Sequence, residues 1–197
     1  MLACLLVTCS AAASERTLLV FGDSLSAAYG LRTDQGWVAL LQQRLQTQGY
    51  GYRVVNASVS GETTDGGRAR LARALSQHRP DLVILELGAN DGLRGLPVKD
   101  IRANLAQMIG AIRGSGAQTL LVGIQIPPNY GPQYTRAFTA MYVGLAKEQN
   151  VPSVPFLLEG IALDKQLMQA DGLHPGAQAQ PRVLENIWTG LRPLLRR

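Results

Sequence analysis

The first residue of this chain with clear chemical potential is a serine placed on a turn. Ser24 lies in the segment Phe-Gly-Asp-Ser-Leu, directly behind the apolar run at residues 18–20. A turn after a buried strand pushes the hydroxyl out of the sheet toward a substrate, as a nucleophilic serine requires. Taken alone, Asp23 or Ser24 can equally cap a following helix.

A base and a carboxylate stand near the other end of the chain. Asp171 and His174 lie in the segment Asp-Gly-Leu-His-Pro. An offset of three residues around a glycine can bring the carboxylate against the imidazole, and Pro175 keeps His174 out of helical geometry. A plain turn or helix cap is the alternative for this segment alone. Together with Ser24, it predicts the nucleophile, base and orienting acid of a serine hydrolase.

Such an enzyme also needs donors for a negatively charged oxygen. The backbone N–H of Ser24 is one candidate. Gly61, in Val-Ser-Gly-Glu-Thr, can bring a second N–H close without a Cβ in the way, and Asn90, in Gly-Ala-Asn-Asp, can offer its side-chain amide. The alternatives are an ordinary loop glycine and a turn asparagine.

Other chemistry finds less support. The second histidine, His78, ends an expected surface helix with no acid beside it. Asp23, Asp91 and Asp171 with His174 could imitate a metal phosphoesterase, but no second histidine is spaced as a ligand pair and no phosphate-binding glycine loop is present. We expect no metal and no organic cofactor.

Strand-like and helix-like runs alternate along the chain. Strands are expected at 17–21, 53–57, 81–87, 118–124 and 151–156, with helices between them. The third run is almost continuously apolar, which indicates a strand buried on both faces of a parallel sheet. Two prolines in the fifth run indicate an edge strand, and the proline-rich loop 126–132 is expected to lack regular structure. The pattern predicts an α/β fold, a three-layer α/β/α sandwich over a five-stranded parallel sheet.

This architecture predicts where the site lies. Ligands of such sheets bind beyond the carboxyl ends of the strands. Ser24, Gly61 and Asn90 follow the first, second and third expected strands. All three are therefore expected on one rim of the sheet.

The first 14 residues read as a segment separate from the fold. They hold a short apolar core followed by small residues, and both cysteines, Cys4 and Cys9. We expect residues 1–14 to be a secretory signal peptide, with a buried N-terminal helix as the alternative. Residues 15–197 would then form one domain without cysteine, in a periplasmic or secreted protein.

Composition limits the partners. The net charge is +5, but the basic residues are scattered and aromatics make up only 6%. This indicates a solvated basic surface rather than a nucleic-acid site. Residues 1–14 are too short to span a bilayer. We expect a monomer with a small-molecule substrate, no nucleic acid and no stable membrane insertion.

Four motifs in order resemble one family. Gly-Asp-Ser-Leu at 22–25, the glycine at 61, Gly-x-Asn-Asp at 88–91 and Asp-x-x-His at 171–174 resemble the blocks of the SGNH, or GDSL, hydrolases. Ala89 stands where the family usually has a second glycine. The resemblance implies a flavodoxin-like fold, Ser24 as nucleophile, His174 as base, Asp171 orienting it, and Ser24, Gly61 and Asn90 forming the oxyanion hole. It also implies that the loop 126–132 gates the substrate and contacts acyl chains.

The resemblance also narrows the expected reaction. It implies hydrolysis of carboxylic esters and acyl thioesters, as by an arylesterase, acyl-CoA thioesterase or lysophospholipase, through an acyl-enzyme on Ser24. Two alternatives remain at this stage. One is a carbohydrate O-acetylesterase of the same family, and the other is a non-catalytic acyl- or lipid-binding protein.

Overall fold

One parallel sheet forms the centre of the molecule. The structure is a computed structural model, and it describes residues 15–197. The strand order is β2-β1-β3-β4-β5, and all pairs are parallel. The strands are β1 (Arg16–Gly22), β2 (Tyr52–Asn56), β3 (Leu82–Glu86), β4 (Gln118–Val122) and β5 (Ser153–Val154). This is the flavodoxin-like order, so the expected fold class is confirmed, with β5 at the edge.

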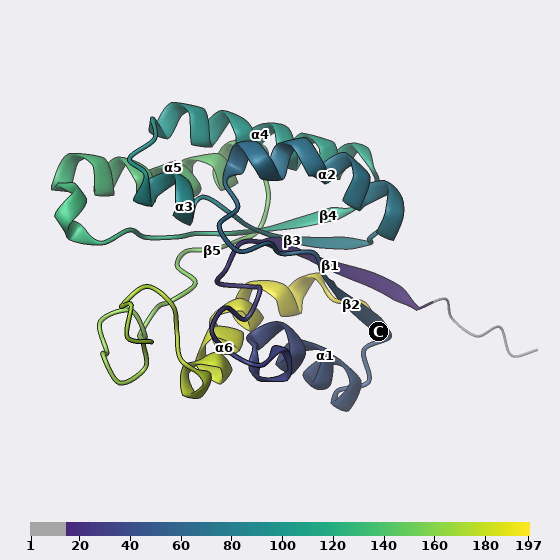
Figure 1. Cartoon of the computed structure of the whole chain (residues 1–197). Coiled ribbons are helices and arrows are strands. Elements are labelled where there is room, and N and C mark those ends of the chain that lie inside the picture. Colours follow the sequence, from purple (N-terminus) through teal and green to yellow (C-terminus); the bar gives the residue numbers. More distant parts are fainter. Residues whose placement is uncertain (1–14) are drawn as a thin grey trace, which may run out of the picture.

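Helices cover both faces of this sheet. They are α1 (Trp37–Thr47), α2 (Thr64–His78), α3 (Ala89–Leu93), α4 (Val98–Gly114), α5 (Pro132–Gln149) and α6 (Gln180–Leu191), with single 3₁₀ turns at Thr33–Gln35, Pro128–Tyr130, Ala177–Ala179 and Arg192–Leu194. α2, α4 and α5 lie on one side, and α1 and α6 lie on the other (Figure 1). The three expected layers are therefore present. None of the helices described in residues 15–197 has the length and apolar character needed to cross a membrane.

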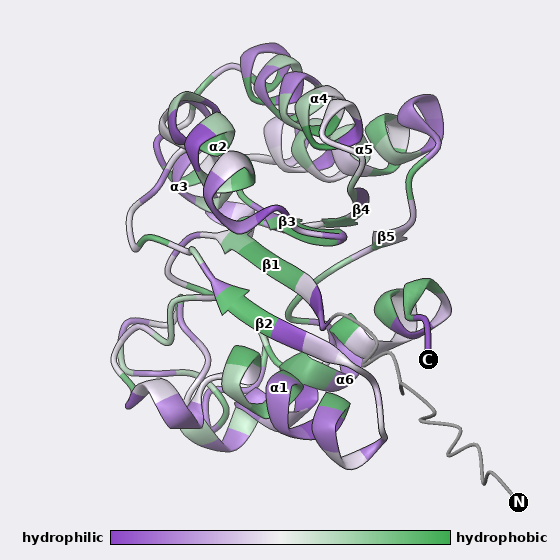
Figure 2. Ribbon diagram, turned by 90° about the vertical axis from the view of Figure 1, so that its right-hand side faces the viewer, coloured by the Kyte–Doolittle hydropathy of each residue, from purple (hydrophilic) through white to green (hydrophobic). Residues whose placement is uncertain are grey.

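The hydrophobic core surrounds β3, the central strand of the sheet. Its apolar residues at 82–85 are at most 1% exposed, because helices pack on both faces. Figure 2 shows the hydrophobic residues concentrated on the strands and on the helix surfaces that face them. Each fully buried leucine or isoleucine contributes roughly 1.5–3 kcal/mol of hydrophobic free energy. A sheet held in this way provides a fixed base for loops at its carboxyl rim.

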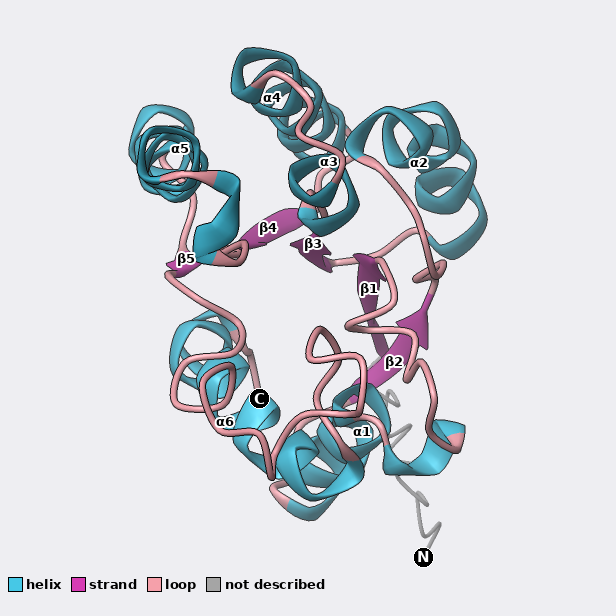
Figure 3. Cartoon of the chain, turned by 60° about the vertical axis from the view of Figure 1, so that its left-hand side comes forward, coloured by secondary structure: helices cyan, strands magenta, loops and turns pink. Residues whose placement is uncertain are grey.

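Two long loops meet at that rim. One follows β1 and the other connects β5 to α6, and they approach each other beside α1 and α6 (Figure 3). The side chain of Gln169 in the second loop donates to the backbone oxygen of Tyr29 in the first, over 2.8 Å. Segments from the two ends of the sequence are thereby joined.

Two short elements differ from the sequence-based expectation. α3 was not expected, because five residues are too few to show helical periodicity. The loop 126–132 was expected to lack regular structure, but Pro128–Tyr130 form one 3₁₀ turn. Proline at the first position of this turn already has the required φ and lacks only an N–H that would be unpaired there. The predicted signal peptide, 1–14, lies outside the described residues.

Candidate active site

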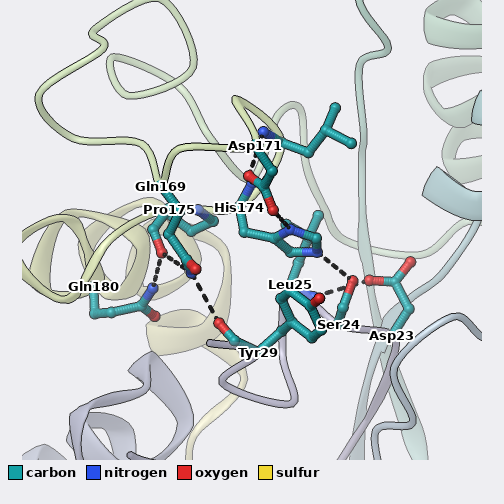
Figure 4. A network of polar contacts seen from close by, with 10 residues as sticks. Asp23, Ser24, Leu25, Tyr29, Gln169, Asp171, His174, Pro175 and Gln180 are labelled. Atoms are coloured by element: carbon teal, nitrogen blue, oxygen red, sulfur yellow. Dashed lines mark hydrogen bonds and ion pairs between the residues drawn. The ribbon is translucent and has the colours of Figure 1, made fainter. Parts of the chain in front are cut away.

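Ser24, His174 and Asp171 are brought together in the structure. Ser24 Oγ lies 2.8 Å from His174 Nε2, across 150 positions of sequence. The other ring nitrogen, Nδ1, lies 2.7 Å from Asp171 Oδ2 (Figure 4). The hydroxyl, imidazole and carboxylate are therefore hydrogen-bonded in series, which is the arrangement that a proton transfer from serine to histidine needs.

The turn at 171–174 uses one carboxylate for two purposes. Asp171 Oδ1 accepts the backbone N–H groups of Leu173 at 2.9 Å and His174 at 3.0 Å, which leaves Oδ2 to face the imidazole. Burial alone would raise the pKa of Asp171, but these two N–H groups and the imidazole outweigh it and leave the pKa below its ordinary value. Asp171 is therefore ionised at neutral pH and fixes the position of the ring.

The imidazole and its neighbouring backbone are also contacted by residues that the sequence analysis did not single out. The ring of Tyr29 lies against that of His174, with 4.4 Å between ring centroids and a tilt of 35°. Gln169 donates to the backbone oxygens of Tyr29 and Pro175, and Gln180 donates to the oxygen of Pro175 (Figure 4). The sequence contains no signal of these contacts, because an aromatic residue or a glutamine in a loop outside any motif follows no recognisable pattern.

The candidate donor Asn90 is hydrogen-bonded to the segments that carry Ser24 and Gly61. Asn90 Nδ2 donates to Asp23 Oδ2 at 3.1 Å and to Glu62 O at 2.9 Å, so its amide lies between the neighbours of Ser24 and of Gly61. Gly61 has a φ of 81°, a conformation that favours glycine. Within residues 15–197, the N–H groups of Ser24 and Gly61 donate to no backbone oxygen. An oxyanion at this place would accept these two N–H groups and replace one acceptor of Asn90.

Asp23 is a buried support of this arrangement. Its carboxylate also accepts the N–H of Leu25 at 3.0 Å. Burial raises the pKa of Asp23 to about 7, although the Leu25 N–H and the Asn90 amide favour the charged form. The contacts of Asp23 orient Asn90 and the turn, and they give no support to the metal phosphoesterase alternative that the sequence analysis disfavoured.

Glu86 holds the turn that carries Ser24, and the sequence analysis assigned it no role. It is fully buried on β3. Its Oε2 accepts the hydroxyl of Ser26 at 2.6 Å and the N–H of Asp23 at 3.3 Å. Burial raises its pKa well above the ordinary value, and the nearby carboxyl of Asp23 adds to the rise. A lone carboxylate in an otherwise apolar strand was the available signal, because an isolated buried charge is costly.

Asp91 has a structural position between two helices. Its carboxylate accepts the N–H of Thr64 at 2.9 Å and the hydroxyl of Thr64 at 2.6 Å. These bonds tie α3 to the start of α2. His78 is the last residue of α2 and does not line the cavity at Ser24. No group of three or more His, Cys, Asp or Glu in the described residues is placed to hold a metal ion.

A small apolar cavity adjoins Ser24 and His174. Its volume is about 160 Å³. Apolar side chains make up most of its wall, among them Leu25, Leu93, Ile124, Ile126, Phe156 and Leu157. An apolar group attached to a carbonyl on Ser24 can therefore be buried there.

Known proteins share the fold and the sequence. The GDSL-like lipase/acylhydrolase family model matches residues 20–181. Esterase TesA of Pseudomonas aeruginosa is 56% identical over 194 residues, covering 98% of this chain and 96% of that protein. Thioesterase 1/protease 1/lysophospholipase L1 of Escherichia coli K12 is 44% identical over 190 residues, covering 96% of this chain and 89% of that protein.

A known crystal structure is similar to this chain in both sequence and fold. The psychrotrophic esterase EstA from Pseudoalteromonas sp., inhibited by monoethylphosphonate, matches with a TM-score of 0.87 and 41% identity, over 91% of this chain and 98% of that one. Both the sequence and the fold of this chain therefore agree with one group of proteins. The chain belongs to the GDSL-like lipase/acylhydrolase family, the family that its four motifs resemble.

Proposed function

We propose that this protein hydrolyses carboxylic esters and acyl thioesters through an acyl-enzyme on Ser24. As a member of an acylhydrolase family, the chain is an enzyme, and the alternative of a non-catalytic binding protein is set aside. The observation that carries the proposal is the series of short contacts from Ser24 Oγ through His174 to Asp171, at 2.8 and 2.7 Å, beside an apolar cavity.

The first half of the reaction forms the acyl-enzyme. Ser24 Oγ attacks the carbonyl carbon and its proton passes to His174 Nε2, while Asp171 stabilises the imidazolium. The carbonyl oxygen becomes negative and accepts hydrogen bonds from the N–H groups of Ser24 and Gly61 and from the Asn90 amide. The bond to the leaving oxygen or sulfur then breaks, and His174 returns the proton to that atom.

The second half releases the acid. Water attacks the acyl carbon and gives a proton to His174 Nε2. The tetrahedral intermediate then breaks its bond to Oγ, and the proton returns to Ser24 as the carboxylic acid leaves. Both steps use groups of this chain alone, and the cycle restores the starting enzyme.

The names of the relatives support the choice of substrates. The proteins from Pseudomonas and Escherichia are named esterase, thioesterase and lysophospholipase. Inhibition of the related EstA by a phosphonate is consistent with a nucleophilic serine. The apolar cavity supports an acyl group of several carbons rather than acetyl alone, which favours these activities over a carbohydrate O-acetylesterase.

We also propose an exported monomer. The signal-like segment at 1–14 supports export to the periplasm or the exterior. All groups assigned to the reaction come from one chain, so the site needs no second copy.

The direct test is Ser24→Ala, assayed with p-nitrophenyl butyrate. We expect kcat/KM to fall by about 10⁴-fold or more, since the nucleophile is lost, while the melting temperature stays near that of the wild type. Ser76→Ala, which makes the same change on an exposed face of α2, should keep full activity. Substantial turnover by the Ser24 variant would refute the assignment.

A further inference from the structure

A second, larger cavity adjoins the catalytic one. Its volume is about 760 Å³, against about 160 Å³ for the cavity at Ser24. The two share part of their walls, which consists of residues 125–127 with Phe156, Leu158 and Leu173. The outer cavity then continues along residues 159–165 of the loop between β5 and α6. A substrate on Ser24 can therefore reach both.

The size of the inner cavity limits what it can hold. An engineered apolar cavity of about 150 Å³ binds one benzene molecule. By this comparison, the inner cavity takes a group of roughly six carbon atoms. An ester has two substituents on its reacting bond, so the second substituent of any larger substrate must lie elsewhere.

The two cavities differ in chemistry. In the inner one, Leu25, Ile124 and Leu157 are buried, at 8%, 3% and 0% exposure. The outer one includes the exposed charged residues Glu159, Asp164 and Lys165 along with its apolar wall. A fatty acyl chain is apolar beyond its carbonyl, whereas the alcohol or thiol half of a lysophospholipid or an acyl-CoA carries polar and charged groups. The acyl group therefore fits the inner cavity and the alcohol or thiol fits the outer one.

The position of the turn that carries His174 agrees with this orientation. In the proposed reaction, His174 Nε2 hands its proton to the leaving oxygen or sulfur, so the leaving group must lie on the imidazole side of the reacting carbon. The outer cavity is walled by Gly172 and Leu173, which directly precede His174, and by Met168. Of the two cavities, only the inner one is lined by Ser24, Asn90 and His174 themselves, whereas Leu173 lines both and Gly172 only the outer one.

The outer wall is held in place by the rest of the fold. Asn186 on α6 donates to the backbone oxygens of Leu157 at 2.9 Å and Glu159 at 3.0 Å. Farther along the loop, Gly176 N donates to Leu167 O at 2.7 Å, and Met168 pairs with Pro175 as an antiparallel bridge. The cavity is therefore preformed, as binding sites for small molecules usually are.

We propose that the outer cavity is the leaving-group subsite, which binds the alcohol or thiol half of the substrate. This inference rests on the proposed function, because it takes Ser24 and His174 as the reacting groups. By this inference, the natural substrates of this protein have a bulky amphipathic leaving group. Its apolar part lies against Phe156 and Leu158, and its polar part lies near Lys165.

The test fills the outer cavity and compares two substrate series. Ala162, a half-buried residue of its wall, is replaced in Ala162→Trp. The first series keeps the acyl group and changes the leaving group, with phenyl butyrate and biphenyl-4-yl butyrate. The second keeps the leaving group and changes the acyl group, with p-nitrophenyl acetate, butyrate and octanoate.

We expect a selective loss in the first series. In Ala162→Trp, kcat/KM for the biphenyl ester should fall about tenfold or more relative to the phenyl ester, because a pocket that is too small excludes the bulky group. The ratios among the p-nitrophenyl esters should stay as in the wild type. Ala72→Trp, the same change on the exposed face of α2, should leave both series unchanged.

Two results would overturn the inference. Unchanged ratios in both series would show that the outer cavity is not used, and a selective loss of octanoate would assign it to the acyl chain. If Ala162→Trp fails to fold, Ala162→Leu gives the same readout with a smaller side chain at the same half-buried wall position. Wild-type turnover of phenyl butyrate that persists in Ser24→Ala would instead refute the proposed function.

Discussion

At the scale of single residues, the arrangement depends on side chains that make more than one hydrogen bond. Asp171 uses one oxygen for the turn and the other for the imidazole. Asn90 bridges from the Ser24 segment to the Gly61 segment through one amide nitrogen. Small changes of atom type at these positions should therefore change the reaction without unfolding the protein.

Asn90→Ala tests the oxyanion donor. We expect kcat to fall by about 10²–10³-fold with KM within about twofold, because the negative oxygen forms only after the ground state. Steady-state kinetics with p-nitrophenyl butyrate measures both constants. A rise in KM with unchanged kcat would make Asn90 a substrate-binding residue instead.

The candidate residues were predictable from the sequence because their types are rare and their spacing is short. Asp171 and His174 belong to one turn, and only two histidines compete for the role of base. Tyr29, Gln169 and Glu86 were not predicted as parts of the site. Their contacts join segments far apart in the chain, and no local pattern records such a contact.

At the scale of elements, the link between β3 and the turn after β1 positions the serine. Glu86 accepts hydrogen bonds from both Asp23 and Ser26, the residues on either side of Ser24. A Cβ at Gly22 would lie 2.5 Å from Glu86 Oε2, so the glycine is needed for this close approach. The two central strands therefore act as one support for the nucleophile.

Glu86→Gln tests how this support responds to pH. Because burial raises the pKa of Glu86, the folded chain keeps it protonated where the unfolded chain has already ionised it. Folding then takes up a proton, so stability falls as pH rises above the ordinary pKa, by up to about 1.4 kcal/mol per pH unit for one group. Glutamine cannot ionise and retains an acceptor oxygen for both donors.

We therefore expect the unfolding free energy of Glu86→Gln, measured by urea denaturation, to gain on that of the wild type between pH 5 and pH 8. Glu159→Gln, a change at an exposed glutamate, should follow the wild type throughout. A constant difference between Glu86→Gln and the wild type over this range would contradict a buried, protonated Glu86.

The sequence predicted the long elements better than the short ones. The continuous apolar run of β3 indicated a strand covered on both faces, and its residues are fully buried. α3 was missed because five residues form little more than one turn, too short for a hydrophobic period to show. Its contacts are tertiary, and those of Asp91 with Thr64 tie it to α2.

At the scale of the whole molecule, topology does most of the positioning. Ser24, Gly61 and Asn90 follow neighbouring parallel strands, so the carboxyl rim brings them together. This convergence was predictable from the alternation of strands and helices. The docking of the loop between β5 and α6, which delivers His174 and walls the outer cavity, was not, because irregular loops have no periodic signal.

The whole chain also allows a prediction about its first segment. The two cysteines lie at positions 4 and 9, so residues 15–197 contain none. We expect a protein that begins at residue 15 to keep the kcat/KM of the longer chain and to show the same melting temperature with and without dithiothreitol. A clear loss of activity on truncation would mean that residues 1–14 belong to the fold rather than to a signal.

The central claim is that one hydroxyl attacks the substrate. The most direct measurement is covalent labelling with a fluorophosphonate, followed by mass spectrometry of the intact protein and of its peptides. The account predicts one adduct per chain, on the peptide that contains Ser24, and none in Ser24→Ala. No adduct on the active wild-type protein, or an adduct on another residue that persists in Ser24→Ala, would contradict it.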